Sequence, residues 1–584
     1  MINKINFSNV AANRFSKKTN NEKQNTQVEG KNSQYFGHST SPKISANYFV
    51  PFLGKKDYTA NEKEYAALKK QLSKKFHKLN KNAEETCWDF YINSTDENEK
   101  KYSDAFSKSL KLSSDEKILE NLQKAEAAGV ADPLLKKSLD KLLKDYKETV
   151  VNAAAIQLME DKQTEISKKF NGCRGEVEGK VYSNSQLNKM LETEKNVELR
   201  KEIYSARKVK APDLIADDLV NLVKTRNEYA KKNGYDNYFS YMLKETYKVD
   251  EKKLFSLLDD LADKTDKIYD KTSKKRDEKL ADAYGIATKD LRPWHYGLQM
   301  EGSPTKEADK YLKDSDTMVK SATEMYKKMG WDIPKMPILL DLFPKENKNQ
   351  HGFCFSVDTN KDVRILANLT NNMDSLETLN HELGHAVYDI GISGHLSYFD
   401  REPASSAMTE AVAMLMQTLP QREGMFEETL NMPKELSNKL DNSRRKGSVN
   451  FVRQSLVLIN FEKELYKNPD QDLPKLWSGL EKKYLNKNMQ EKPDNSWASI
   501  PHFLTHPAYY QNYLRAEIIA SQVYDAAREK LGPLNQSGDT ADFMRKKIFR
   551  HGASLTEDEV IKNATGKDLS VDAFCNQFKD LKVD

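Results

Sequence analysis

Apolar residues recur at three- and four-residue steps along most of this chain, a spacing typical of amphipathic helices. In "EKKLFSLLDDLADKTDKIYDK", for example, Leu254, Leu257, Leu258 and Leu261 fall on one helical face and charged residues occupy the rest. Similar stretches follow one another, and no internal repeat is visible. Breaks between them fall at Asp132-Pro133, Gly172, Gly234 and Pro293. We therefore predict a mainly α-helical protein whose charge-rich helix faces meet solvent.

One stretch departs from the helical period. "HGFCFSVDTNKDVRILANL", residues 351–369, holds two short aromatic or β-branched runs around the turn "DTNK", which predicts a β-hairpin. It ends shortly before His381, the start of a candidate metal motif. A strand beside such a motif offers a backbone edge on which an extended peptide lies as an added strand. A purely structural hairpin fits this pattern equally well.

A second segment lacks charge altogether. "NSWASIPHFLTHPAYYQNYL", residues 495–514, contains no Asp, Glu, Lys or Arg in a chain that is 31% charged. Pro501 and Pro507 interrupt it, and its two His and three Tyr make it too polar to cross a membrane. We interpret it as core or as the wall of a cleft.

Composition and charge exclude several classes of protein. The net charge of +5 is fully accounted for by residues 1–50, so the rest of the chain is neutral overall. It therefore lacks the excess of positive charge expected of a nucleic-acid-binding protein. Residues 1–48 show no apolar period and are predicted to be a disordered basic leader. The chain has neither an 18-residue apolar run nor an apolar secretory signal, and its four cysteines are widely spaced. These features predict a cytoplasmic monomer without membrane or nucleic-acid partners; the alternative is export through the leader by a route without an apolar signal.

The strongest chemical signal is "HELGH". On a helix, His381 and His385 share one face, so both imidazoles reach a single ion, and Glu382 lies beside them. A chance match is expected in roughly one or two such chains per hundred. The alternative is an ordinary helix with two surface histidines.

A hydrolytic zinc site needs three protein ligands and an open position. Glu410 is the best third candidate, because it is the only acid in the helical run "SSAMTEAVAMLMQTL", which Ser405 or Ser406 would cap. A carboxylate among Ala, Val, Met and Leu is costly to bury unless it meets a cation. Three other candidates are less suitable. His395 lies past a glycine-rich break, Asp389 lies on the same helix in line with the first two ligands, and Glu402 precedes a proline.

His381-Glu382-x-x-His385, followed 25 residues later by Glu410, resembles the glutamate-zincin peptidases of the angiotensin-converting enzyme and thimet oligopeptidase/oligoendopeptidase group. The resemblance is greatest to bacterial relatives of angiotensin-converting enzyme. It extends to "HGFCFSVDTNKDVRI", "REPASSAMTEA", "DLRPWHYG" and "IPHFLTHPAYYQNYLRAEIIASQ", and covers most of residues 60–580. It implies two helical lobes facing a deep groove, with one zinc at the floor and a small antiparallel sheet beside the zinc helix. Residues 49–584 would form this single catalytic domain, with two helical subdomains.

The resemblance also assigns roles to individual residues. Glu382 would be the general base, and His381, His385 and Glu410 would hold one Zn²⁺. Tyr513 matches the tyrosine that stabilises the oxyanion, and His502 matches a histidine that holds the substrate carbonyl. His351 and Tyr510 match residues that contact the substrate backbone and its C-terminal carboxylate. For His506 a structural role is favoured.

Four features of angiotensin-converting enzyme are missing here. Its carboxylate-binding Lys is Ile500 here, its chloride-binding Arg is Asn512, and its carboxylate after the third ligand is Met414. Its disulfide around the hairpin is absent, because Gln350 and Asn368 occupy the matching places. These changes argue against strict dipeptidyl-carboxypeptidase action and chloride activation.

We therefore predict zinc-dependent hydrolysis of short peptides, because a narrow groove in this group excludes folded proteins. A catalytically silent peptide-binding scaffold with the same cleft is the alternative from another class. The sequence leaves open whether cleavage is internal or releases C-terminal dipeptides, and it does not define the side-chain preference.

Overall fold

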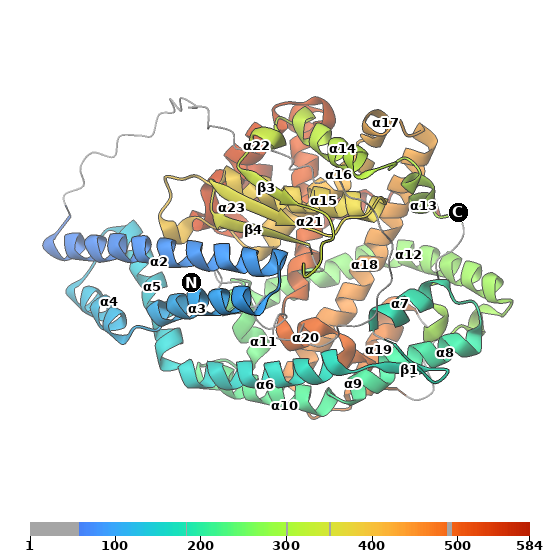
Figure 1. Ribbon diagram of the computed structural model, residues 1–584, viewed down its shortest axis with the longest axis horizontal. Helices are drawn as coiled ribbons and strands as arrows, with labels where there is room; N and C mark the ends of the chain where they lie inside the picture. The colour runs from blue at the N-terminus through green and yellow to red at the C-terminus, as the bar shows by residue number, and fades with distance from the viewer. Residues whose placement is uncertain (1–57, 183, 299–301, 350–351, 487–492, 584) are drawn as a thin grey trace.

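The computed structural model describes residues 58–182, 184–298, 302–349, 352–486 and 493–583 (Figure 1). The predicted leader, residues 1–48, and the predicted substrate contact His351 lie outside the described residues. Helices dominate the rest and the strands form two small sheets, so the predicted mainly α-helical class is confirmed. None of the described helices has both the length and the apolar composition needed to cross a bilayer.

Four N-terminal helices form a layer along one side of the molecule (Figure 1). Each begins after a side chain that accepts hydrogen bonds from its first amides, namely Thr59, Thr95, Asp115 and Asp132. Pro133 takes the first helical position after Asp132, where no amide donor is needed, which confirms the predicted break. The first, third and fourth of these helices share a small core, whereas Tyr102 and Phe106 of the second pack in a separate cluster with the end of the first. These helices are α2 (Ala60–Ile92), α3 (Asp96–Ser113), α4 (Glu116–Ala128) and α5 (Pro133–Val151).

A large lower core is bordered by α6 (Ala153–Gly172) and α10 (Ala216–Lys232), which run along the bottom of the view in Figure 1. The leucine stripe predicted for residues 251–271 lies here: Leu254, Leu258 and Leu261 are buried and Leu257 is partly buried against them. Period-3.6 patterning therefore placed this helix face correctly. The other main helices around this core are α12 (Glu251–Tyr284), α18 (Lys434–Lys467) and α19 (Leu473–Leu485).

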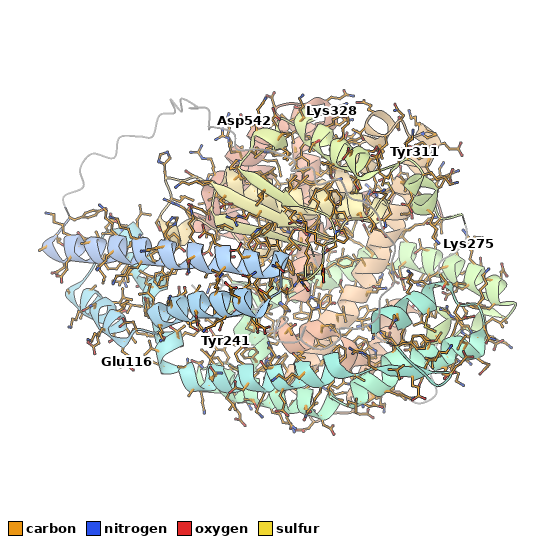
Figure 2. All side chains as sticks on the ribbon, viewed as in Figure 1. Glu116, Tyr241, Lys275, Tyr311, Lys328 and Asp542 are labelled. Carbon is orange, nitrogen blue, oxygen red and sulfur yellow. The ribbon has the colours of Figure 1, made fainter. Side chains whose placement is uncertain are left out.

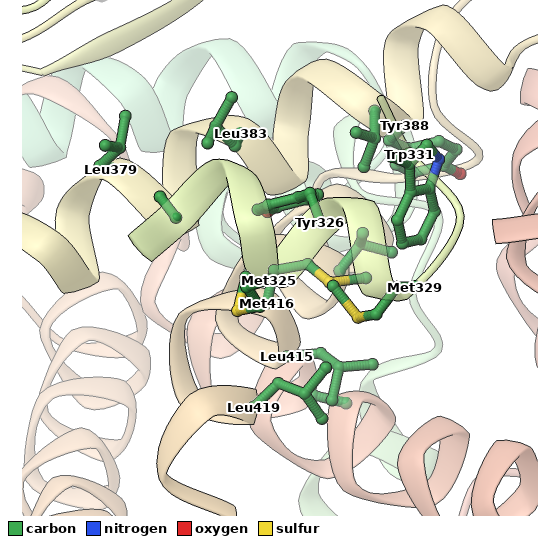
Figure 3. Packing of buried hydrophobic residues seen from close by; sticks show 14 of the residues in the cluster. Met325, Tyr326, Met329, Trp331, Leu379, Leu383, Tyr388, Leu415, Met416 and Leu419 are labelled. Carbon is green, nitrogen blue, oxygen red and sulfur yellow. The ribbon is translucent and has the colours of Figure 1, made fainter. Parts of the chain in front are cut away.

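An upper core packs against the back of α15 (Met373–Gly391), the helix that carries "HELGH". Figure 3 shows Leu383 of α15, Tyr326 of α14 (Ser315–Lys328) and Met416 of α16 (Ser406–Arg422) in this core. The Tyr326 hydroxyl donates to the Asn380 carbonyl at 2.7 Å, so a buried side chain braces α15 one residue before His381. At Gly384 the helices α15 and α16 approach so closely that an added Cβ would lie 2.8 Å from the Ala413 Cα. Glycine between the two histidines therefore lets α16 lie directly against them.

Two long helices tie the cores together. In α18, Leu436 belongs to the upper core and Leu456 to the lower; in α21 (Tyr510–Leu531), Leu514 belongs to the lower core and Ile519 to the upper. In Figure 1 both helices run between the top and bottom of the molecule. The predicted two-lobed arrangement is thus joined by continuous helices rather than by loops alone.

The predicted hairpin is present as β4 (Phe353–Asp358) and β5 (Asp362–Leu366), paired antiparallel. Asn360 turns the chain with φ +64°, a left-handed conformation that Asn tolerates well. The predicted small antiparallel sheet also contains one parallel pair: β3 (Ile338–Asp341) pairs in parallel with β5, giving the order β3-β5-β4. The strand is only four residues long, "ILLD", which is too short for a periodicity that separates strand from helix, so the sequence did not reveal β3.

Charged side chains line the outside of the molecule. Figure 2 labels Glu116, Lys275, Lys328 and Asp542 at its periphery, as expected for solvated helix faces. Shorter elements complete the fold: β1 (Gly175–Val177), β2 (Lys180–Tyr182), α7 (Asn184–Thr193), α8 (Val197–Ser205), α9 (Ala211–Asp213), α11 (Tyr238–Tyr241), the π-helix η3 (Met242–Thr246), α13 (Pro304–Asp309), α17 (Phe426–Thr429), α20 (Pro501–Thr505), α22 (Thr540–Lys547), α23 (Glu557–Thr565) and α24 (Asp572–Asn576).

Candidate metal centre and groove

Three ligand-type side chains converge between α15 and α16. The Nε2 atoms of His381 and His385 lie 3.2 Å apart. Glu410 Oε2 lies 3.6 Å from His381 Nε2 and 3.9 Å from His385 Nε2. One donor atom from each of the three residues falls within 4.8 Å of the other two. Two imidazoles and one carboxylate are a donor set suited to a zinc ion with one open position.

Each imidazole is held at its far side by a neighbour on α16. His381 Nδ1 lies 3.1 Å from Gln417 Oε1, and His385 Nδ1 lies 2.9 Å from the Thr409 hydroxyl. An amide oxygen only accepts, so His381 Nδ1 carries the proton and its Nε2 lone pair faces Glu410. Partners of this kind fix ring orientation in metal sites. Sequence reasoning missed both, because nothing in an uncharged helix distinguishes Thr409 or Gln417 from its neighbours.

Glu410 reaches this position because α16 begins where predicted. Ser405, one of the two predicted caps, accepts a hydrogen bond from the Met408 amide. The second carboxylate oxygen of Glu410 accepts a hydrogen bond from the Tyr509 hydroxyl at 3.3 Å. Tyr509 is a further contact that sequence reasoning missed, although it lies in the uncharged segment noted above.

Burial shapes the electrostatics of the cluster. Desolvation, and then the Glu410 carboxylate, raise the pKa of Glu382 to about 8, and desolvation raises the pKa of Glu410 to about 7. Desolvation also lowers the pKa of His381 to about 4 and that of His385 well below its usual value. Within the described part of the chain, no lysine or arginine forms an ion pair with Glu382 or Glu410. The imidazoles are neutral, so they do not compensate the two desolvated carboxylates. A bound cation would supply the positive charge that this cluster needs.

Glu382 lies beside the cluster and at the start of the hairpin. Its side chain is largely buried, and a Cβ added to Gly352 would lie 3.5 Å from its Oε1. The chain that enters β4 therefore passes directly by this carboxylate. Glu382 and the three ligand-type residues all line one groove.

The opposite wall is the histidine–tyrosine segment, residues 502–513. The His502 ring lies 4.7 Å from the Tyr510 ring and 6.0 Å from the Tyr513 ring, between centroids. The Tyr513 ring lies 5.1 Å from that of Tyr509. Because Tyr509 contacts Glu410, this wall faces the ligand cluster. The uncharged segment serves in both of the ways considered: Trp497 and Phe503 lie in the lower core, and its histidines and tyrosines line the groove.

Other residues considered from the sequence lie in different surroundings. His506 Nδ1 contacts the neighbouring Thr505 hydroxyl at 2.7 Å, and burial lowers its pKa to about 4. His395 is exposed, and Glu402 pairs with Lys141 at 3.2 Å. Asp389 lines the groove, where burial raises its pKa to about 7. Among the described residues, the group of ligand-type side chains consists of His381, His385 and Glu410 and includes none of these four.

The groove is long and contains both apolar and charged surface. Its volume is about 2730 Å³, well above the roughly 300–1,000 Å³ of sites for single small molecules. The α2, α5 and α12 helices, strand β4 and the chain after η3 line it together with α15, α16 and the histidine–tyrosine segment. Space of this size suits an extended chain of several residues.

Two of the positions that depart from angiotensin-converting enzyme have clear surroundings. Ile500 packs partly buried against the lower core, and Met414 lines the groove. Neither offers a charge.

Comparison with known proteins agrees with this geometry. A profile of peptidase family M3 matches residues 190–580, more than half of the chain, which includes every element of the ligand cluster and its facing wall. The chain belongs to peptidase family M3. The predicted glutamate-zincin group is thereby confirmed.

Two curated relatives are similar to parts of the chain. Saccharolysin of Saccharomyces cerevisiae is 22% identical over 456 residues, covering 65% of this chain and 64% of the relative. Mitochondrial intermediate peptidase of Arabidopsis thaliana is 24% identical over 208 residues, covering 34% of this chain and 29% of the relative. The matches thus span less than two thirds of either relative.

Proposed function

We propose that this protein is a zinc metallopeptidase that hydrolyses peptide bonds in short peptides. The observation that carries the proposal is the convergence of His381, His385 and Glu410 on one point of a groove that Glu382 also lines. Membership of peptidase family M3 supports the reaction class.

His381 Nε2, His385 Nε2 and one oxygen of Glu410 would hold one Zn²⁺ per chain. When bound, the ion supplies a Lewis acid for the scissile carbonyl and lowers the pKa of a coordinated water. Gln417 and Thr409 would keep the two rings oriented toward it.

Glu382 is the general base in this proposal. It takes a proton from the attacking water and later delivers it to the nitrogen of the leaving amine. Its burial beside the groove favours this role, because a carboxylate with a raised pKa accepts a proton readily.

Tyr513 and His502 would donate hydrogen bonds to the oxygen of the scissile carbonyl as negative charge develops on it. Burial lowers the pKa of His502, which favours the neutral ring, and its buried Nδ1 has no hydrogen-bond partner among the described residues. Buried polar atoms are normally paired, so this nitrogen is suited to a group that arrives with the substrate. Tyr510 beside it would contact the far end of the peptide.

The groove favours short, extended substrates. It lies between the two cores and the N-terminal helices, so a peptide bond inside a folded domain would not reach Glu382. A silent peptide-binding scaffold, the alternative function, would use the same groove without the chemistry.

The test measures zinc content and cleavage of an internally quenched peptide by the native chain and by Glu382→Gln. We expect one zinc per chain in both, and cleavage only by the native chain. Glu402→Gln is the matched control: it makes the same change at another carboxylate that lines the groove, where Glu402 pairs with Lys141 at 3.2 Å. It should cleave at the native rate.

Zinc without cleavage in the native chain, across a varied set of peptides, would instead favour the scaffold. Absence of zinc would contradict the proposed site altogether. Peptides with a free or an amidated C-terminus then separate internal cleavage from release of C-terminal dipeptides, because only the latter needs the free carboxylate.

A further inference from the structure

The histidine–tyrosine segment holds an unusual backbone conformation. Between α20 and α21, Ala508 has φ +57°, in the left-handed region that non-glycine residues rarely occupy. Its side chain is only 1% exposed. Such a conformation persists where the surroundings hold it, so the contacts of this turn decide where the flanking His502, Tyr509 and Tyr513 lie.

Arg226 of α10 binds the backbone at the start of the turn. Its Nη1 donates to the Phe503 carbonyl at 3.0 Å and its Nη2 donates to the Leu504 carbonyl at 2.6 Å. These carbonyls belong to the short α20, whose last carbonyls have no partner within the helix. Tyr466 and Gln163 fix the same guanidinium at 3.1 and 2.9 Å, and Arg226 is 3% exposed.

Two more side chains of the lower lobe bind the next part of the turn. Glu462 Oε1 accepts a hydrogen bond from the Ala508 amide at 2.7 Å, and the Tyr247 hydroxyl donates to the Pro507 carbonyl at 3.1 Å. The backbone groups of residues 503, 504, 507 and 508 are therefore all bound from one side. From the other side, Tyr509 reaches Glu410 of the ligand cluster.

We propose that Arg226, Glu462 and Tyr247 are positioning residues for catalysis: they hold the histidine–tyrosine segment in its position opposite the ligand cluster on α15 and α16. This inference rests on the proposed function. Its physical basis is that a wall displaced by about 1 Å loses alignment with the reacting carbonyl, which costs on the order of 100-fold in rate. Arg226 and Glu462 act through the backbone that carries His502 and Tyr513. Tyr247 binds the same backbone, and its ring also lies 6.0 Å from that of Tyr509, between centroids.

The test compares Arg226→Met with Arg453→Met. Arg453 is equally buried at 3% exposure in the same lobe, but it donates to the Ala262 carbonyl at 2.8 Å, away from the segment. Zinc content, kcat, KM and amide hydrogen exchange of residues 501–513 are measured for each. We expect Arg226→Met to lower kcat about 10- to 100-fold with KM changed less than about threefold, to keep one zinc, and to speed exchange of the segment about tenfold. Arg453→Met should leave the exchange of this segment and kcat near native values.

A second pair of variants makes a smaller change, so the proposal remains testable even where Arg226→Met fails to fold. Tyr247→Phe and Tyr269→Phe each remove one hydroxyl that donates to a carbonyl, Pro507 and Leu485 respectively, at 3.1 and 2.9 Å. Only Tyr247→Phe should speed exchange at residues 501–513 and lower kcat, by about three- to tenfold.

Native exchange and native kcat in both Arg226→Met and Tyr247→Phe would overturn the proposal, as would equal losses in the two controls. A native chain that cleaves no peptide would contradict the proposed function alone, because the exchange measurement still decides whether these residues hold the segment.

Discussion

The two walls of the groove are built in different ways. The ligand cluster lies on two adjoining helices, and His381 and His385 face each other because they are four residues apart on α15. The histidine–tyrosine segment spans a short helix, a turn and the start of α21, and Arg226, which holds it, lies 277 residues from Phe503 in sequence. One wall is therefore set by helical geometry and one close helix contact, and the other by long-range contacts to the backbone. Loss of a ligand from the first wall should abolish metal binding, whereas changes to the second wall should spare the metal and alter the rate.

The largest effect is expected from Glu410→Ala. It removes one of three ligands, so zinc content should fall far below one per chain and cleavage should drop by about three orders of magnitude or more. Elemental analysis and steady-state kinetics measure both. Glu402→Ala is the control, because Glu402 also lines the groove but pairs with Lys141. Full zinc content in Glu410→Ala would exclude it as a ligand.

Tyr513→Phe should come next and should act on the rate alone. Loss of one oxyanion donor typically lowers kcat by about 10²- to 10³-fold, and the hydroxyl is not part of the ligand cluster, so zinc should stay at one per chain. Tyr510→Phe is the comparison, since its expected effect is a higher KM. A rise in KM without a change in kcat for Tyr513→Phe would contradict the role in the transition state.

Gln417→Ala tests the first wall more gently. His381 loses the acceptor that orients its ring, so zinc affinity should weaken by about 10- to 100-fold while the ligands themselves remain. Competition with a chromogenic chelator gives the affinity. Gln421→Ala, one turn further along α16, removes an amide bonded to Glu377 and should bind zinc like the native chain.

The last prediction concerns the second wall and the pH dependence of stability, with no change in activity required. Burial raises the pKa of Glu462 to about 8, above its usual 4.5. The folded state then keeps a proton that the unfolded state has released, so the contribution of Glu462 to stability is complete below pH 4.5 and is lost as the pH rises to about 8. The slope is at most about 1.4 kcal/mol per pH unit.

Glu462→Gln retains an oxygen for the Ala508 amide but does not titrate. Its free energy of unfolding, measured with denaturant between pH 5 and 9, should therefore fall less with rising pH than that of the native chain. Parallel profiles for the two proteins would show that Glu462 titrates normally in the folded state.

Much of the first wall was predictable because its signals are local. "HELGH" predicted two ligand-type residues on one helix face, and the lone acid after Ser405 predicted the third ligand. Elsewhere in the fold, the helical period predicted the leucine stripe of α12. Alternation of aromatic and β-branched residues gave β4 and β5. The parallel partner β3 escaped detection, because its pairing depends on residues more than 20 positions away.

The sequence by itself determined which chemistry is available: two imidazoles, two carboxylates and a run of uncharged histidines and tyrosines. Tertiary structure alone decided how these groups meet. Close packing at Gly384 brings Glu410 to the histidines, and Gln417 and Thr409 orient the rings. The buried side chains of Arg226 and Glu462 place the opposite wall. The physical reason is that local spacing fixes relations within one helix, whereas contacts between helices arise only when buried polar groups and close-packed cores are satisfied together.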